Sequence, residues 1–303
     1  MKKIFITGSC GFFLSNFIRK AIHFKLDYKI SSIDIINKSH ILNNVFQNKN
    51  HSFNIGSCSD KHLLNILFMS DKPDVIIHGA FDDVDVNNNL IQTATLLEEC
   101  KNHNIKKFVF LSSSEVYGDG KNNNLSENFM PMPITDVGVI KSVSEDFVKK
   151  YCVLHNIEYT IVRVADFFGP RQSKSKFIVD SFYKLKNNKE VLLTNNGNNL
   201  KDWGHVVDGV NGLIKIIDNG NSNDEYNLSR GFHLTELEIL LEFCKILGFN
   251  NNLIKISNSN KQINSALDNS KLKALGWEPE IDLQNSIEYF SKWYLDNNWW
   301  FND

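Results

Sequence analysis

The sequence predicts an α/β fold in which a doubly wound parallel sheet is joined to a smaller C-terminal lobe. Short apolar runs alternate with helical patterns of roughly 10–15 residues over the first half of the chain, as in βαβ units. Two glycines, Gly8 and Gly11, separate the first apolar run from the first helical pattern, and Asp34 lies near the end of the second run. Together these features indicate a Rossmann-type fold, in which such a turn binds a dinucleotide.

Each element of the first half follows from its apolar spacing. The first strand is the run KKIFIT, which Gly8 stops, and apolar residues then recur at helical spacing from Phe13 to Ile22. The expected strands lie at residues 2–7, 30–36, 51–55, 74–78, 107–111 and 158–162. The expected helices lie at residues 12–24, 61–69, 89–103 and 136–155.

The pattern becomes less regular in the second half. Helices are expected at residues 177–186, 207–218, 235–247 and 283–297, with a short strand at 191–194. We assign residues 1–165 and 203–232 to the dinucleotide-binding domain. Residues 166–202 and 233–303 are assigned to the smaller, substrate-binding lobe over the carboxyl edge of the sheet. Trp299 and Trp300 are expected to cap this lobe rather than to stack on a nucleobase.

Composition excludes several classes of function. The net charge is −2 and no basic stripe is present, which argues against nucleic-acid binding. The five cysteines lie far apart and form no C-x-x-C pair, so we expect a reducing, cytoplasmic compartment and neither a disulfide framework nor a metal site. No apolar run approaches the roughly 18 residues of a membrane span, and the apolar run after Met1 is too short for a signal peptide.

The turn after the first strand has the composition of a phosphate-binding loop. Gly8 suits a tight turn, and Gly11 lets backbone N–H groups at the helix start approach a pyrophosphate. Leu14 stands where a third glycine would serve helix–strand packing. Asp34 can accept hydrogen bonds from ribose hydroxyls and would repel a 2′-phosphate. The sequence therefore favours NAD over NADP.

The stretch from Phe108 to Lys141 carries the predicted chemistry. Its apolar strand ends in three serines and Glu115, and Lys141 stands one turn into the following helix. Hydroxyls at the carboxyl end of a strand, with a lysine nearby, indicate chemistry on a carbonyl or alcohol beside the cofactor. Val137 occupies the position, four residues before Lys141, where a tyrosine would be useful.

The order of these motifs resembles the extended short-chain dehydrogenase/reductase superfamily, whose members act mainly on nucleotide sugars. The matching segments are ITGSCGFFLSNF, VIIHGAF, NLIQTATLLEE, FVFLSSSEVYG and KDWGHVVDGVNGL. The ending DNSKLKALGWEPEIDLQNSIEYFSKWYLDNNWW is similar to that of nucleotide-sugar 4,6-dehydratases. By this resemblance the NAD site is lined by Gly8, Gly11, Phe12, Phe13, Asp34, Ile35, Asn54, Ile55, Ala80 and Lys141.

The resemblance also implies catalytic roles. Ser113 matches the hydroxyl that bonds the reacting oxygen, Glu115 matches the base at C5, and Lys141 matches the lysine on the nicotinamide ribose. Ser114 replaces an acidic residue of the family, and Val137 replaces its tyrosine. The 5-inverting UDP-N-acetylglucosamine 4,6-dehydratases also have an apolar residue at the tyrosine position, so this chain resembles them there. It lacks the Asp–Lys pair that those enzymes have beside the serine/threonine position.

Substrate contacts are implied at five further positions, namely Asp82, Asp166, Lys176, Lys201 and Arg171, with Arg163 as another cationic candidate. Candidates to replace the missing acid are Asp82, Asp83, Asp85, Asp136 and Asp166. The alternative for each is a solvated loop carboxylate or a helix cap, which is the more common case. His78 is expected to be structural rather than a base.

Three hypotheses remain open. The first is an NAD-dependent 4,6-dehydratase acting on a UDP- or dTDP-hexose, with UDP-N-acetylglucosamine and 5-epimerisation favoured by Val137. The second is a nucleotide-sugar epimerase or reductase on the same fold, and the third is a catalytically weakened nucleotide-sugar-binding homologue. The family resemblance also implies a homodimer through the helices at 89–103 and 136–155.

Overall fold

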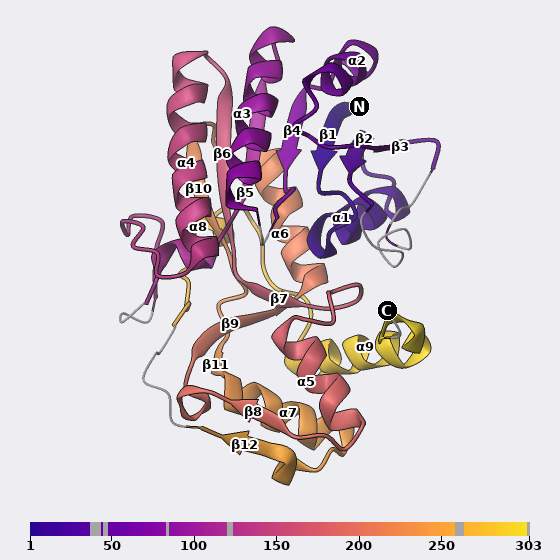
Figure 1. The fold of residues 1–303 in the computed structure, drawn as a ribbon, viewed down its shortest axis with the longest axis vertical. Coiled ribbons are helices and arrows are strands. Elements are labelled where there is room, and N and C mark those ends of the chain that lie inside the picture. Colours follow the sequence, from indigo (N-terminus) through magenta and orange to yellow (C-terminus); the bar gives the residue numbers. More distant parts are fainter. Residues whose placement is uncertain (37–43, 45–47, 83–84, 120–123, 258–263, 302–303) are drawn as a thin grey trace.

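The larger part of the molecule is a parallel sheet, shown in the upper half of Figure 1. This computed structural model describes residues 1–303 except 37–43, 45–47, 83–84, 120–123, 258–263 and 302–303. The sheet strands are β1 (Lys2–Thr7), β2 (Tyr28–Asp34), β3 (His51–Ile55), β4 (Val75–His78), β5 (Lys107–Ser113), β6 (Glu158–Val164) and β10 (Asp224–Leu228). Their order is β10-β6-β5-β4-β1-β2-β3, and every neighbouring pair is parallel. This is the doubly wound order, so the predicted fold class is confirmed.

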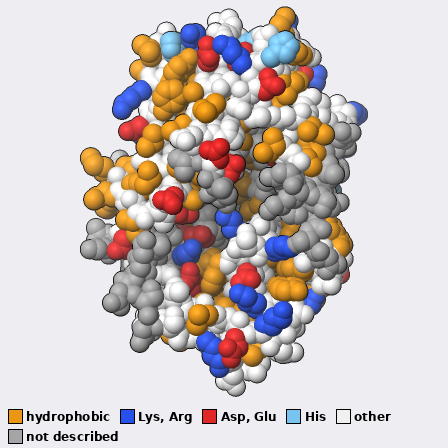
Figure 2. Space-filling view, in the orientation of Figure 1, with side chains coloured by type: hydrophobic (Ala, Val, Ile, Leu, Met, Phe, Trp, Pro, Cys, Tyr) orange, Lys and Arg blue, Asp and Glu red, His pale blue; other side chains and the backbone are white. Residues whose placement is uncertain are grey.

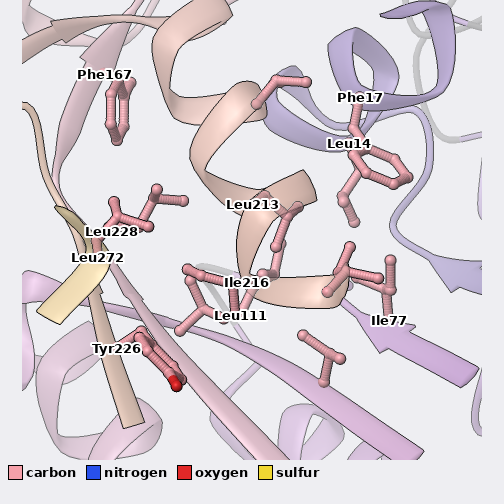
Figure 3. Close-up of a cluster of buried hydrophobic side chains, with 14 of the residues drawn as sticks. Leu14, Phe17, Ile77, Leu111, Phe167, Leu213, Ile216, Tyr226, Leu228 and Leu272 are labelled. Carbon is pink, nitrogen blue, oxygen red and sulfur yellow. The ribbon is translucent and has the colours of Figure 1, made fainter. Parts of the chain in front are cut away.

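Helices cover both faces of this sheet. One face carries α1 (Phe12–His23) and α6 (Val206–Asn219), and the other carries α2 (Lys61–Asp71), α3 (Val86–Asn102) and α4 (Asp136–Leu154). Alternate strand residues serve the two faces, since Ile4 and Ile6 pack toward α1 and α6 while Phe5 packs toward α2. Figure 3 shows Leu213 and Ile216 of α6 lying among the apolar side chains of the first face.

A smaller lobe lies below the carboxyl ends of the strands (Figure 1). Its strands are β7 (Asp166–Phe168), β8 (Val191–Leu193), β9 (Leu200–His205), β11 (His233–Thr235) and β12 (Ile254–Ile256). Its longer helices are α5 (Phe177–Lys186), α7 (Glu236–Leu247) and α9 (Leu283–Asp296), and a short helix, α8 (Ser270–Lys273), packs against β10 and α6. Short 3-10 turns include η2 (Ser114–Tyr117), η3 (Asn195–Gly197), η4 (Asn251–Leu253) and η5 (Asn298–Phe301). An aromatic core that includes Phe168, Phe182, Phe243 and Phe290 joins these helices. Within the described residues, no helix is both long and apolar enough to cross a membrane.

A buried ion network lies where the sheet meets α4. The Arg163 side chain on β6 is only 1% exposed, and its Nη2 lies 2.8 Å from Glu145 Oε2 on α4 and 2.6 Å from Glu225 Oε2 on β10. Its Nη1 donates to the Tyr117 hydroxyl at 2.9 Å. Arg163 is therefore a core residue, and its suggested role as a cationic contact for substrate is wrong.

Replacing Arg163 by alanine should lower the free energy of unfolding by about 3–5 kcal/mol, because Glu145 would stay buried without its partner. Chemical denaturation followed by circular dichroism measures this loss. The matched control is Lys150→Ala, which removes an exposed ion pair with Asp146 on the same helix and should cost less than about 1 kcal/mol. Equal losses in the two variants would contradict a structural role for the network.

Candidate active site

A cavity of about 480 Å³ opens where the carboxyl ends of the central strands face the segment between β7 and α5. It lies at the switch point of the sheet, where doubly wound folds bind dinucleotides. The predicted site residues that line it are Gly8, Gly11, Phe12, Asp34, Ile35, Ala80, Asp82, Arg171 and Lys176. The cavity thus joins predicted cofactor contacts with two cations predicted for the substrate.

The turn between β1 and α1 is built to accept an anion. Gly8 has φ +73°, and a Cβ there would lie 2.5 Å from the backbone nitrogen of Ala80, so only glycine fits. Gly11 is the N-cap of α1, where no side chain of the described residues makes a capping bond and the first turn carries no acid. The donors of this first turn therefore suit the pyrophosphate of NAD.

Asp34, at the end of β2, is hydrogen-bonded to the turn between β1 and α1. Its carboxylate accepts hydrogen bonds from the backbone nitrogens of Cys10 at 2.7 Å and of Ile35 at 2.8 Å. Burial raises the pKa of this carboxyl, and the backbone donors oppose that rise. Asp34 also lines the cavity, as its predicted role as a ribose contact requires.

Four predicted cofactor contacts, Phe13, Asn54, Ile55 and Lys141, do not line the cavity. Asn54 Nδ2 donates to the Ser32 carbonyl within the sheet, and Ile55 is 67% exposed. The Phe13 ring packs against Phe167 at a centroid distance of 5.8 Å. The wall near β3 is formed instead by residues 56–58, which sequence reasoning missed by one position.

Ser113 and Glu115 are held where β5 meets α4. The Ser113 hydroxyl accepts a hydrogen bond from the Glu115 backbone nitrogen at 3.2 Å. Thr135 donates to Glu115 Oε2 at 2.6 Å and accepts from the Gly138 nitrogen as the N-cap of α4. A Cβ on Gly138 would lie 2.4 Å from the Glu115 carbonyl oxygen. Ser114 is buried beside them.

Lys141 lies beneath an aromatic side chain of the cavity wall. Its side chain is buried, and Nζ donates to the Leu111 carbonyl at 2.8 Å. The ammonium lies 4.2 Å from the ring centroid of Phe81 and 4.9 Å from that of Phe110. Phe81 lines the cavity, whereas Lys141 is not among the described residues that do. Val137 lies one turn earlier on the same helix and offers no polar group.

Asp166 and Lys201 form a separate cluster in the smaller lobe. Lys201 Nζ lies 3.5 Å from Asp166 Oδ1, and Ser265 donates to Asp166 Oδ2 at 3.2 Å. The charge of Asp166, followed by those of Glu236 and Glu115, raises the pKa of Lys201 against its burial. The charge of Glu115 therefore reaches this cluster.

The other candidate acids have local roles. Asp85 is the N-cap of α3 and accepts from the Asn88 nitrogen at 3.1 Å. Asp136 stands in the first turn of α4, where a carboxylate favours the helix dipole. Asp82 lines the cavity, and its backbone nitrogen donates to Asn89 at 2.8 Å. Asp83 lies outside the described residues.

Sequence reasoning missed Phe81, Thr135 and Gln92. Thr135 had a usable signal, because a threonine directly before an expected helix is a typical N-cap. Phe81 and Gln92 are placed by tertiary packing and had none. Trp300 both packs in the lobe and lines the cavity, and its Nε1 donates to the Gln172 carbonyl at 3.0 Å.

Comparison with known proteins decides the family. The model of the NAD dependent epimerase/dehydratase family matches residues 4–229. The chain belongs to this family. The predicted relationship to nucleotide-sugar dehydratases is confirmed, and NAD is the family cofactor, as Asp34 predicted. Among the described residues, no group of three or more His, Cys, Asp or Glu side chains could hold a metal ion.

Several relatives match this family member over nearly its whole length. Human dTDP-D-glucose 4,6-dehydratase is 23% identical, covering 98% of this chain and 92% of the relative. A low-salt glycan biosynthesis protein from Haloferax volcanii is 26% identical, covering 97% and 99%. The crystal structure of dTDP-glucose 4,6-dehydratase from Bacillus anthracis with NAD is 26% identical, covers 100% and 99%, and superposes with a TM-score of 0.93.

His78 is part of a buried polar chain behind the cavity. Its Nδ1 lies 2.7 Å from the Thr7 hydroxyl and its Nε2 lies 3.1 Å from that of Thr93. Because Thr93 donates to the Asn89 carbonyl, its oxygen is free to accept from Nε2. Burial, with a smaller contribution from the charge of Lys141, lowers the pKa of His78 to about 3. His78 is thus a neutral residue of the core.

This low pKa predicts a pH-dependent stability. Between its pKa of about 3 in the folded chain and about 6.5 in the unfolded chain, the unfolded state binds one more proton at His78. The free energy of unfolding should therefore decrease as pH falls through this window, by up to about 1.4 kcal/mol per pH unit. Chemical denaturation at a series of pH values should show a shallower slope in His78→Gln. The exposed control His62→Gln should keep the wild-type slope, and an unchanged slope in His78→Gln would contradict the assignment.

Proposed function

We propose that this family member is a nucleotide-sugar 4,6-dehydratase that produces a 4-keto-6-deoxy sugar nucleotide. The observation that carries the proposal is the β5–α4 junction, where Ser113, Glu115 and Lys141 are held at the edge of the sheet that carries the NAD cavity. The 4,6-dehydratases among the relatives support the same reaction class.

In the proposed reaction, each of the side chains at this junction has a separate role. NAD supplies the hydride acceptor for C4 oxidation and the hydride donor for C6 reduction. The Glu115 carboxylate removes the C5 proton and passes it to the C6 oxygen, which leaves as water as the C5–C6 double bond forms. Thr135 orients that carboxylate through one of its two oxygens. Ser113 contributes a hydroxyl for the C4 oxygen, and Lys141 contributes the positive charge beside it.

Two substitutions direct the choice of substrate. Val137 removes the phenol that usually takes the C4 hydroxyl proton, and Ser114 replaces the acid that protonates the departing C6 hydroxyl. Because position 137 is apolar, we propose UDP-N-acetylglucosamine as the preferred substrate, with inversion at C5. On this proposal Asp166 and Lys201, together with Asp82 in the cavity wall, contact the sugar nucleotide.

The proposed reaction is tested with purified protein and UDP-N-acetylglucosamine, UDP-glucose and dTDP-glucose, analysed by mass spectrometry and NMR. A product lighter by one water, with a 4-keto-6-deoxy sugar, supports the dehydratase. An epimer of unchanged mass identifies an epimerase, and oxidation of added NAD(P)H by a keto-sugar identifies a reductase. Binding without turnover of any sugar identifies a non-catalytic homologue.

Replacing Glu115 by glutamine should reduce kcat by about 10²–10⁴-fold, because the amide cannot accept the C5 proton. Affinity for NAD, measured by calorimetry, should stay unchanged. The control Glu278→Gln alters a carboxylate whose side chain is exposed and does not line the cavity, and it should retain wild-type turnover. Full activity of Glu115→Gln would contradict the role of this carboxylate.

We further propose a cytoplasmic homodimer formed through α3 and α4. These helices pack against each other and expose Ile91, Val139, Val143 and Phe147. Such apolar side chains on adjacent helices favour pairing with a second copy. All five cysteines are free, as suits a reducing compartment.

The dimer is tested by Val143→Asp, which should convert it to a monomer, because a charge at the centre of an apolar interface would be desolvated without a partner. Light scattering measures the molecular mass. Leu192→Asp, at an even more exposed apolar position in the smaller lobe, is the control and should stay dimeric. A monomeric wild-type protein would rule the interface out.

A further inference from the structure

The segment between β7 and α5 forms a second wall of the NAD cavity. Arg171, Gln172, Ser173 and Lys176 line the same cavity as Gly8 and Gly11. The segment is tied to the start of α1, because Asn16 Nδ2 donates to the carbonyls of both Phe12 at 2.8 Å and Pro170 at 3.0 Å. Arg171 therefore follows a residue anchored to the helix turn that presents its N–H groups to the pyrophosphate.

The C-terminal aromatics fix the backbone beside Arg171. The Gln172 carbonyl accepts hydrogen bonds from the Tyr294 hydroxyl at 2.7 Å and from Trp300 Nε1 at 3.0 Å. Arg171 itself has φ +70°, a left-handed conformation that is strained for a non-glycine residue. Its guanidinium lies 5.2 Å from the ring centroid of Trp293. The arginine is thus held at the cavity wall by residues of the C-terminal lobe.

Arg171 has a local charge environment that an anion would complement. Burial and the like charge of Arg19 lower its pKa to about 10. Among the described residues, no carboxylate lies within ion-pairing distance of it, and Tyr294 alone acts in the opposite direction. A partly buried guanidinium beside a second cation is unfavourable until a negative group lies next to it.

We propose that Arg171 binds the pyrophosphate of NAD, so that the dinucleotide is held between the first turn of α1 and the segment 170–176. Lys176, which also lines the cavity, adds a second positive charge. The residues expected around the sugar, Glu115, Asp166 and Lys201, do not line this cavity in the described part of the chain. Arg171 is therefore reassigned from the nucleotide sugar to the cofactor, and the proposal does not depend on which sugar reacts.

The test compares ligands that share or lack the pyrophosphate. Calorimetry on nucleotide-free protein measures NAD, ADP-ribose, ADP, adenosine and UDP, with weak ligands measured by displacement. Arg171→Gln should weaken NAD, ADP-ribose and ADP by about tenfold or more, since a charge-assisted hydrogen bond is lost. Adenosine and UDP should bind as they do to the wild type. The control Lys174→Gln, an exposed cation of the same segment outside the cavity wall, should leave all five affinities unchanged.

Three results would overturn the proposal. An unchanged NAD affinity in Arg171→Gln would show that Arg171 does not contact the pyrophosphate of NAD. A loss of affinity confined to UDP would show that Arg171 contacts the sugar nucleotide instead. An equal loss for adenosine would indicate general damage to the cavity. If thermal unfolding shows that Arg171→Gln is not folded, Arg171→Lys replaces it and should weaken NAD and ADP-ribose but not adenosine, because lysine lacks the paired donors of a guanidinium.

Discussion

The position of the candidate catalytic residues depends on one buried guanidinium. Arg163 on β6 binds Glu145 of α4, Glu225 of β10 and Tyr117 of η2. A charge removed from water in this way is tolerated only when its partners are all in place. The three elements must therefore assemble together around β6. Glu115, two residues before Tyr117, is consequently positioned by a core interaction and not by a free loop.

The same region brings two backbones unusually close. The carbonyl of Glu115 approaches Gly138 on the first turn of α4, where even a methyl group would clash. Thr135 uses one hydroxyl both to cap that helix and to orient the Glu115 carboxylate. One turn later, Lys141 donates back to the end of β5. Ser113, Glu115 and Lys141 thus belong to one hydrogen-bonded unit, and such fixed geometry is the preorganisation that the proposed acid–base chemistry requires.

Long elements with strong apolar periodicity were predictable from sequence, whereas short and polar ones were not. The strands Leu200–His205 and Asp224–Leu228 contain charged residues, and only their neighbours in the fold make them strands. At the site, the positions of Gly8 and Asp34 could be predicted from neighbouring residues, because one follows the first strand at a tight turn and the other ends the second strand. The contact of Phe81 with Lys141 joins residues far apart in the chain and has no local signature.

In the proposed dehydratase, Val137 changes the proton chemistry but leaves the contacts that hold Lys141 in place. In the absence of a phenol at this position, the Lys141 ammonium is still fixed by the Leu111 carbonyl and by the face of Phe81. Its charge therefore remains against Phe81, which lines the cavity. In the proposed reaction the proton of the C4 hydroxyl needs another acceptor, because a valine side chain cannot accept it. On our proposal a carboxylate near the sugar takes that role, and the charges of both Asp166 and Glu115 act on Lys201. If the chain is the proposed dehydratase, the substitution moves proton transfer toward the smaller lobe, while the contacts of the Lys141 ammonium are kept.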